Sequence, residues 1–259
     1  MTKTATVLVI GAHFEEVEAE FPNICALLSA ASCRVVILNP IGGWNWTSVR
    51  EMGPDARENL LAASSAAAAC LGCEKVVWDY PVSATAGVQD EICQRLADFI
   101  LTVQPEIVLM HWPEDIHPDH RAVARYTRHV LGCAPNLVPD LGRRLSVKEV
   151  YAFQTGVIQA YNYVPDLLIK CSEESMAKAK QALDCFKGQF PADYASTWWQ
   201  NVQAKAQYWQ MLSGDAPAEA LKYLGPNLPV DGLLLKKILG ERLVGIGTDA
   251  WLRWSALQY

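Results

Sequence analysis

Segments with the pattern of a β-strand alternate with segments that have the pattern of an α-helix along the first half of the chain. Each short apolar run, rich in β-branched residues, is followed by a stretch whose apolar residues recur at helical spacing. The expected strands are 6–10, 34–39, 75–78 and 106–111, and the expected helices are 17–31, 55–71, 89–103 and 119–131. This alternation predicts parallel βαβ units with right-handed crossovers. We therefore expect a Rossmann-like α/β fold with a doubly wound, mostly parallel sheet.

The second half of the chain has a looser pattern. Further strands are expected at 149–155 and 167–171, and further helices at 173–186 and 198–212. The length of 259 residues is compatible with one large α/β domain. We expect the α/β domain to occupy residues 1–190 and a C-terminal helical extension, residues 191–259, to pack on the same domain.

The charge and hydropathy of the chain argue against two classes of partner. The net charge is −6 and the Lys and Arg residues are scattered, so a nucleic-acid partner is not expected. No uninterrupted apolar stretch reaches about 18 residues, so no membrane span is expected. Residues 1–12 lack the apolar core and cleavage site of a signal peptide. We expect a cytoplasmic protein.

Eight cysteines lie mostly within apolar segments, in a chain too long to need disulfide bonds for stability. Buried free thiols are therefore expected. Cys70 and Cys73 have the spacing of half a zinc ribbon, but no second CxxC or CxxH completes a set of four ligands. We expect no metal ion at this pair.

Histidines and carboxylates gather directly after two of the expected strands. Residues 11–16 read GAHFEE after the first strand, and residues 111–120 read HWPEDIHPDH after the fourth. Ligands of doubly wound folds bind outside the carboxyl ends of the strands, so both segments are expected at one edge of the sheet. A lone His or Glu there is usually a loop or N-cap residue. Two imidazoles and a carboxylate together, however, are the ligand set of many catalytic zinc sites, so a metal centre is expected.

A dinucleotide site is the main alternative, because the first strand also leads into a helix. The turn after that strand lacks the GxGxxG pattern that binds phosphate. Glu15 and Glu16 would also repel a phosphate group at this position. A nicotinamide-binding Rossmann domain is therefore not expected.

The two segments resemble motifs of the LmbE/PIG-L N-deacetylases, a family that removes acyl groups from N-acetylated amino sugars and related small molecules. Residues 115–123 read DIHPDHRAV and are similar to the family's DxHPDHRAV motif. Residues 13–17 read HFEEV where the family has HPDDE, so order and spacing are kept while both Asp residues are replaced by Glu. The likeness spans roughly residues 6–186 and implies an LmbE-like fold.

The resemblance implies a role for each residue that matches a motif position. The implied ligands of zinc, or of another divalent transition metal, are His13, Glu16 and His120. Glu15 would be the general base, and His117 would stabilise the oxyanion or protonate the leaving amine. Asp119 would orient an imidazole by hydrogen bonding.

Three further residues are candidates for substrate binding. Arg57 lies near the position of a substrate-contacting arginine in the family, although a solvated helix residue is an equal interpretation. Phe14 replaces the motif proline and would line the pocket. Trp112 would stack on a sugar face or cap an acyl chain, although tryptophans in such loops more often serve packing.

The function implied by the resemblance is a zinc-dependent hydrolase that removes an acyl group, most plausibly acetyl, from an N-acylated amino sugar, glycoside or similar small molecule. The alternative is a metal-retaining binding protein or pseudoenzyme, because each Glu side chain is one methylene longer than the Asp it replaces. Hydrolysis of another bond, such as an ester, is a third interpretation. The expected partner is a small-molecule substrate, and a homo-oligomer is possible by analogy.

Overall fold

A computed structural model describes residues 4–138, 143–156, 159–190, 192–225 and 232–246. Its centre is an eight-stranded sheet with the order β3-β2-β1-β4-β5-β7-β6-β8. The strands are β1 (Thr6–Ile10), β2 (Arg34–Ile41), β3 (Glu74–Tyr80), β4 (Ile107–His111), β5 (Glu149–Phe153), β6 (Leu167–Lys170), β7 (Ala218–Tyr223) and β8 (Leu243–Gly245). The first five strands are parallel to one another, and β7 runs antiparallel to β5 and β6. The expected mostly parallel α/β fold is confirmed.

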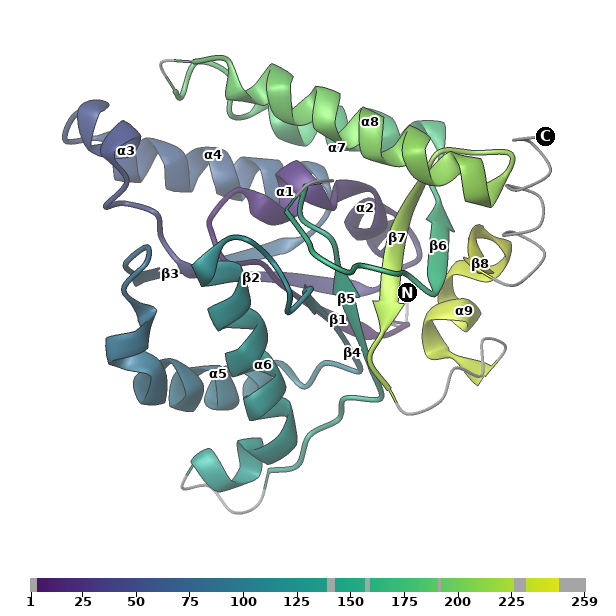
Figure 1. The fold of residues 1–259 in the computed structure, drawn as a ribbon, viewed down its shortest axis with the longest axis horizontal. Helices are drawn as coiled ribbons and strands as arrows, with labels where there is room; N and C mark the ends of the chain where they lie inside the picture. The colour runs from purple at the N-terminus through teal and green to yellow at the C-terminus, as the bar shows by residue number, and fades with distance from the viewer. Residues whose placement is uncertain (1–3, 139–142, 157–158, 191, 226–231, 247–259) are drawn as a thin grey trace.

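Helices cover both faces of this sheet. They are α1 (Glu16–Glu20), α2 (Pro22–Ala30), α3 (Thr47–Glu51), α4 (Ala56–Cys70), α5 (Gln89–Val103), α6 (Pro118–Leu137), α7 (Glu173–Asp184), α8 (Tyr194–Ser213) and α9 (Leu234–Leu239), with the 3-10 helices η1 (Thr85–Val88) and η3 (Gly240–Arg242). Figure 1 shows α1, α2, α4, α7 and α8 on one side of the sheet and α5 and α6 on the other. The fold is therefore doubly wound, with three layers.

Strand β1 shows why the sheet needs helices on both faces. All five of its residues are buried, and alternate side chains point to opposite faces. Val7 and Val9 belong to the core beneath α2, α4 and α7, whereas Leu8 and Ile10 belong to the core beneath α5 and α6. A strand that is apolar on both faces is typical of the centre of a parallel sheet.

The connections of β1 define the topological switch point of the sheet. From β1 the chain proceeds to β2 and β3 on one side, and it then returns to place β4 and β5 on the other side. The loops that leave β1 and β4 therefore diverge at their carboxyl ends and leave a crevice. Both motif segments of the sequence lie in these two loops.

The helix expected at 17–31 is divided into two helices. Pro22 lacks a backbone N–H and occupies the first turn of α2, while Phe21 before it adopts a non-helical conformation with φ −145°. Helix α1 is therefore only one turn long and holds Glu16 at its first position. Because of this break, α1 at the crevice is not a continuation of α2.

The chain after residue 190 is less uniformly helical than expected, because it supplies strands as well as α8. Strand β7 inserts between β5 and β6, and its Glu219 is buried. The Glu219 carboxylate accepts hydrogen bonds from the backbone N–H groups of Asn23 and Ile24 at the start of α2. A charged residue inside the strand hides the apolar pattern that would reveal it. The expected division of the chain at residue 190 stays a prediction, and residues 191, 226–231 and 247–259 of the expected extension lie outside the described residues.

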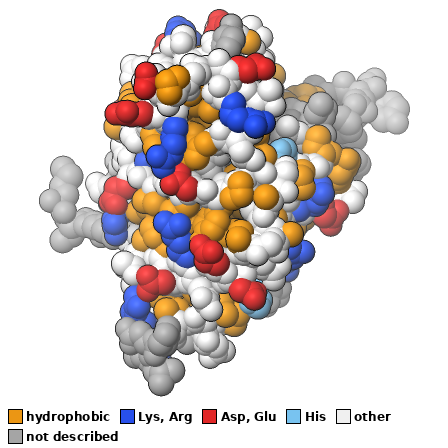
Figure 2. Space-filling model, turned by 90° about the vertical axis from the view of Figure 1, so that its left-hand side faces the viewer, with side chains coloured by type: hydrophobic (Ala, Val, Ile, Leu, Met, Phe, Trp, Pro, Cys, Tyr) orange, Lys and Arg blue, Asp and Glu red, His pale blue; other side chains and the backbone are white. Residues whose placement is uncertain are grey.

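The described surface mixes charged and apolar side chains. On the face drawn in Figure 2, basic and acidic side chains are interspersed, with hydrophobic side chains between them. No helix within the described ranges is long and apolar enough to cross a membrane.

Candidate metal centre

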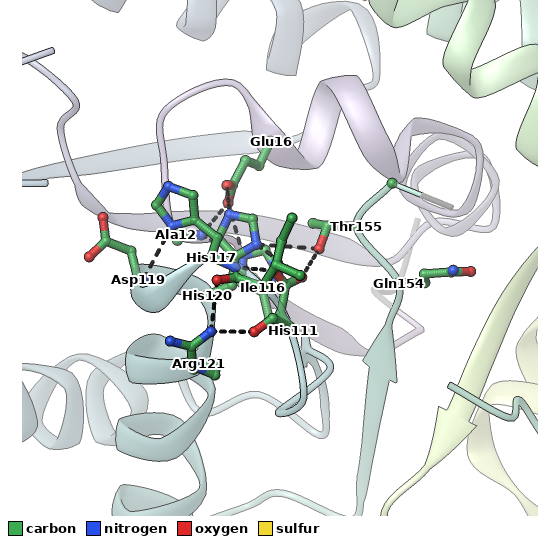
Figure 3. A network of polar contacts seen from close by, with 12 residues as sticks. Ala12, Glu16, His111, Ile116, His117, Asp119, His120, Arg121, Gln154 and Thr155 are labelled. Carbon is green, nitrogen blue, oxygen red and sulfur yellow. Dashed lines mark hydrogen bonds and ion pairs between the residues drawn. The ribbon is translucent and has the colours of Figure 1, made fainter. Parts of the chain in front are cut away.

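The candidate metal centre lies at the switch point of the sheet, where side chains from β4, α1, α6 and their loops converge (Figure 3). His13 lies in the loop after β1 and forms an isolated bridge with Ile41 at the end of β2. His117 is the N-cap of α6, and Pro118 occupies the first turn, where a missing N–H costs no hydrogen bond. Two motifs about 100 residues apart in sequence thus share one edge of the sheet.

One group at this centre offers two imidazoles and a carboxylate. The ligand atoms of His13, Glu16 and His120 lie within 4.8 Å of one another, and all three side chains are buried. Nδ1 of His13 is 2.7 Å from Oε1 of Glu16, and Nε2 of His120 contacts the same oxygen. This is the set that the resemblance implied, and its chemistry suits zinc or another divalent transition metal.

A second group overlaps the first. His13, His117 and Asp119 also bring ligand atoms within 4.8 Å of one another. Oδ2 of Asp119 lies 3.0 Å from Nε2 of His13, and both Asp119 oxygens accept a hydrogen bond from the backbone N–H of Ser83. Because Asp119 already holds an imidazole and a backbone amide, we favour it as a residue that orients His13. Its position matches the orienting role implied by the resemblance.

A further buried carboxylate, Asp115, orients His120. Its Oδ2 atom lies 3.1 Å from Nδ1 of His120 and accepts a hydrogen bond from the Thr155 hydroxyl. Its Oδ1 atom accepts from the backbone N–H of His117 at 2.7 Å. Asp115 is the first residue of the second motif, but the resemblance implied no role for it. Its position five residues before His120, at the end of a loop, was the available signal.

His111 was also missed as a member of the site. It ends β4, is fully buried, and places Nε2 2.9 Å from Oε2 of Glu16. Its ring stacks on that of His120, with centroids 4.5 Å apart and planes at 4°. Burial lowers the pKa of His111, so this imidazole is neutral near pH 7. A histidine that closes an otherwise apolar strand was the signal that sequence offered.

The electrostatics of the cluster favour a cation beside Glu16. Burial is the largest single effect and opposes charge on His13 and His120, but Glu16 and the other nearby carboxylates together outweigh it, so the pKa of His13 is raised to about 9 and that of His120 to about 10. Burial likewise opposes charge on Glu16, yet the surrounding imidazoles hold its pKa well below the usual value. A buried carboxylate that draws protons onto two imidazoles would attract a metal ion in their place.

Glu15 is buried beside this group and has an oxygen without a partner. Among the described residues, its Oε2 atom makes no hydrogen bond although it is inaccessible to solvent. Burial raises the pKa of Glu15 to about 7, against the lowering effect of His13. A carboxylate with a free oxygen and a pKa near neutrality is suited to accept a proton from a reacting molecule.

His117 faces the same cavity in a neutral form. Burial and the neighbouring His120 lower the pKa of His117 to about 4. Its Nδ1 atom accepts a hydrogen bond from the backbone N–H of Asp119 at 3.2 Å, so the neutral ring carries its proton on Nε2. His117 therefore has an N–H to donate.

The cavity that connects these residues has a volume of about 190 Å³. Polar side chains of the centre form one wall, and Trp46 and Trp198 contribute aromatic walls. The His13 and Trp46 rings are 4.8 Å apart between centroids. Trp198 comes from α8, so the region after residue 190 completes the cavity.

Comparison with known protein families gives a match over the first half of the chain. The family model described as PIG-L: GlcNAc-PI de-N-acetylase matches residues 8–131. Residues 8–131 form a PIG-L (LmbE-like) family domain. The match runs from within β1 into α6 and includes both motifs, and the resemblance seen in the sequence is confirmed. A comparison with curated proteins finds no match.

Several solved structures share the fold beyond the PIG-L domain. The conserved protein TT1542 from Thermus thermophilus is 22% identical, covering 88% of this chain and 99% of its own, with a TM-score of 0.67. The 4-carboxy-2-hydroxymuconate hydratase GalB from Pseudomonas putida is 21% identical, covering 86% and 97%, with a TM-score of 0.67. The N,N'-diacetylchitobiose deacetylase from Pyrococcus horikoshii is 17% identical, covering 88% and 89%, with a TM-score of 0.70. At these identities the likeness shows the fold alone, and one fold hosts several reactions.

The three expected substrate-binding residues of the PIG-L domain lie outside the residues that line the cavity. Phe14 is fully buried and stacks on Trp44, with centroids 5.3 Å apart. Arg57 is half-exposed and pairs with Asp79 at 2.6 Å. The indole N–H of Trp112 donates to the backbone oxygen of Tyr161 at 2.7 Å. Their contact with substrate stays a prediction.

The cysteine pair lies apart from the metal centre. Neither Cys70 nor Cys73 belongs to a potential ligand group among the described residues. The Cys70 sulfur is instead 3.9 Å from the sulfur of Cys185. All eight cysteines are free thiols, but only Cys25, Cys33, Cys93 and Cys171 are buried, and the other four are partly exposed.

Proposed function

We propose that the protein is a zinc-dependent hydrolase that removes an acyl group such as acetyl from an N-acylated amino sugar, glycoside or similar small molecule. One observation carries the proposal: Glu15, a buried carboxylate with an unpartnered oxygen, lines the same cavity as the His13, Glu16 and His120 group. The base and the metal ligands are thus within reach of one substrate. The PIG-L family match and the deacetylases among the structural neighbours support the same reaction class.

The residues of the centre divide the chemistry among them. A bound zinc ion would polarise the scissile carbonyl and lower the pKa of water. Glu15 accepts the proton of the attacking water. His117 lines the cavity, and its Nε2–H would donate to the developing oxyanion or to the departing nitrogen.

Asp119 and Asp115 act through the imidazoles that they hold. Asp119 bonds to His13 and Asp115 to His120, so each proposed histidine ligand has a carboxylate behind it. Such partners fix the orientation of a ligand ring and raise its basicity. Packing of the histidines alone does not require a carboxylate behind each ring, so this arrangement supports a metal site.

The shape of the cavity favours a small acyl group. Sites that enclose a drug-sized ligand measure about 300–1,000 Å³, and this cavity of about 190 Å³ is smaller. It would hold an acetyl group and the adjoining nitrogen, with Trp46 positioned for a sugar face. The eight free thiols support a reducing compartment, and we place the reaction in the cytoplasm.

Two variants test the assignment of the neighbouring glutamates. Glu15→Gln keeps the shape of the side chain and removes the proton acceptor, so acetate release should fall by about two to four orders of magnitude while bound zinc is unchanged. Glu16→Ala should instead deplete zinc. The measurements are elemental analysis and acetate release from a panel of N-acetylated amino sugars, with exposed Glu58→Gln on α4 as the control.

The outcomes separate the proposal from its alternatives. Full activity of the Glu15→Gln variant would remove Glu15 as the base. A wild-type protein that binds zinc and an amino sugar but releases no acetate would instead be a metal-retaining binding protein. Because GalB is described as a hydratase, the panel should include an unsaturated carboxylic acid, and hydration of that compound without acetate release would replace hydrolysis by hydration.

A further inference from the structure

The C-terminal end of α1 is held by the side chain of Lys205 on α8. Nζ of Lys205 donates to the backbone oxygen of Glu20, the last residue of α1, at 2.8 Å, and it also pairs with the Glu20 carboxylate. Asn201, one turn earlier on α8, donates from Nδ2 to the same carboxylate at 3.2 Å. The side chains of Lys205 and Glu20 are only 7% and 13% exposed. Helix α8 therefore restrains the end of α1 that lies opposite Glu16.

The carboxylate of Glu20 needs a partner from outside α1. A negative charge at the C-terminal end of a helix is unfavourable, because the helix dipole is negative there. A helix of one turn is also too short to maintain its conformation by itself in water. The ammonium group of Lys205 offsets both effects, since it neutralises the carboxylate and binds a carbonyl that no later turn of α1 can pair. The placement of Glu16, at the other end of the same turn, thus depends on α8.

The Glu20 carboxylate also restrains a second part of the metal centre. Its Oε2 atom accepts a hydrogen bond from the backbone N–H of Gly156 at 3.0 Å. The residue before Gly156 is Thr155, whose hydroxyl oxygen lies 3.3 Å from Nδ1 of His120 (Figure 3). One carboxylate thus joins α1, which carries Glu16, to the loop after β5, which contacts His120. Glu20 and Thr155 both line the cavity of the metal centre.

The face of α8 that makes these contacts also forms a wall of the cavity. Trp198, Asn201 and Lys205 are spaced at i, i+3 and i+7, so they lie on one side of the helix. This side packs against α1 (Figure 1), and Trp198 lines the cavity. The PIG-L family match ends at residue 131, so the family likeness assigns no role to α8.

We propose that Lys205 is a positioning residue of the metal centre. It acts through Glu20, which restrains Glu16 on one side and the loop beside His120 on the other. The inference rests on the proposed function, because it assumes that zinc and a substrate bind at this centre. A buried ion pair is by itself weak evidence for stability, since apolar residues of similar volume often replace such a pair without loss. The contacts of this pair with two parts of the site therefore point to a role in function.

The variant Lys205→Met tests the proposal, because it removes the charge and keeps an unbranched side chain of similar volume. Lys222→Met is the matched control. Lys222 pairs with Asp166 at 2.6 Å, but it lies on β7 and is not among the described residues that line the cavity. Zinc affinity is measured by competition with a chelator, and kcat and KM by acetate release from the panel sugar that the wild type hydrolyses fastest. Urea unfolding of the zinc-free protein gives the stability.

A positioning role and a structural role give different results. If Lys205 positions the centre, kcat should fall about 10- to 100-fold with little change in KM, and zinc affinity should fall about tenfold or more. The control should match the wild type in all three. A folded Lys205→Met variant that is less stable but keeps the wild-type kcat and zinc affinity would overturn the proposal.

A second variant covers the case in which Lys205→Met does not fold, because it leaves the carboxylate of Glu20 without its counter-charge. Glu20→Met/Lys205→Met removes both charges, so it should be more stable than the single variant. Its zinc affinity, which involves no substrate, should still be about tenfold or more below that of the wild type. A wild-type zinc affinity in the folded double variant would assign the pair to stability alone.

The failures of the two proposals are distinguishable. A wild-type protein that binds zinc but releases no acetate would remove the proposed hydrolysis, and the zinc affinities of the variants would then decide the role of Lys205. A wild-type protein that binds no zinc would overturn both proposals.

Discussion

At the scale of single residues, Glu16 is the carboxylate on which the contacts of the candidate metal centre converge. Its Oε2 atom accepts hydrogen bonds from the backbone N–H groups of Ala12 and His13 at 2.6 and 3.0 Å. His111 approaches the same oxygen, and Oε1 faces His13 and His120. These contacts restrain the longer side chain that stands where the family has Asp, so the added methylene does not leave the carboxylate loose.

Asp115→Asn is the sharpest test at this scale. The amide keeps the shape of the side chain but removes the charge behind His120, so zinc affinity should fall about 10- to 100-fold. Competition with a chelator measures the affinity. The control Asp79→Asn changes an exposed carboxylate that pairs with Arg57, and it should leave the affinity unaltered. Equal affinities for both variants would show that Asp115 does not act through His120.

At the scale of elements, the start of α6 and the shortness of α1 place the site. His117 caps α6 and Pro118 begins it, so His120 lies in the first turn and faces the crevice. Pro22 separates α1 from α2, so α1 is only one turn long, and Glu16 is its first residue. In helix α4, a run of alanines allows the helix to pack closely on the sheet.

The alanine run of α4 yields a matched pair of substitutions. Ala67 is fully buried in the core of the sheet face, whereas Ala66 beside it is exposed. Ala67→Leu should lower the free energy of unfolding by about 1–3 kcal/mol through overpacking, and Ala66→Leu should change it by less than about 0.5 kcal/mol. Urea unfolding followed by circular dichroism gives both values. Similar losses for the two variants would contradict the packing described for α4.

At the scale of the whole molecule, the order of strands brings the two motifs together. Parallel strands β1 and β4 are neighbours in the sheet although β2 and β3 intervene in sequence. The crevice between them collects carboxylates and imidazoles into one buried cluster, so the protonation of this cluster is linked to global stability.

Without zinc, the stability of the protein should decrease as the pH becomes alkaline. The pKa values of His13 and His120 are raised to about 9 and about 10 in the folded protein, from an ordinary value near 6.5. Their contribution to stability is therefore fully present below pH 6.5 and is lost as the pH rises to 10. The unfolding temperature of the metal-free protein should fall over this range, whereas the gain on adding zinc should grow, because zinc competes with fewer protons. A constant gain between about pH 6 and 9 would contradict the assignment of these two ligands.

The sequence alone predicted the parallel sheet and the three residues of the candidate ligand group, His13, Glu16 and His120. Alternating and helical patterns of apolar residues show which faces of the strands and helices are buried. The motif around His120 can be recognised from the spacing of its own residues. Only the tertiary structure revealed β7, whose buried Glu219 conceals a strand until its partners at the start of α2 are known. It alone brought His111 to Glu16, 95 residues away in sequence, and gave Asp115 its place behind His120.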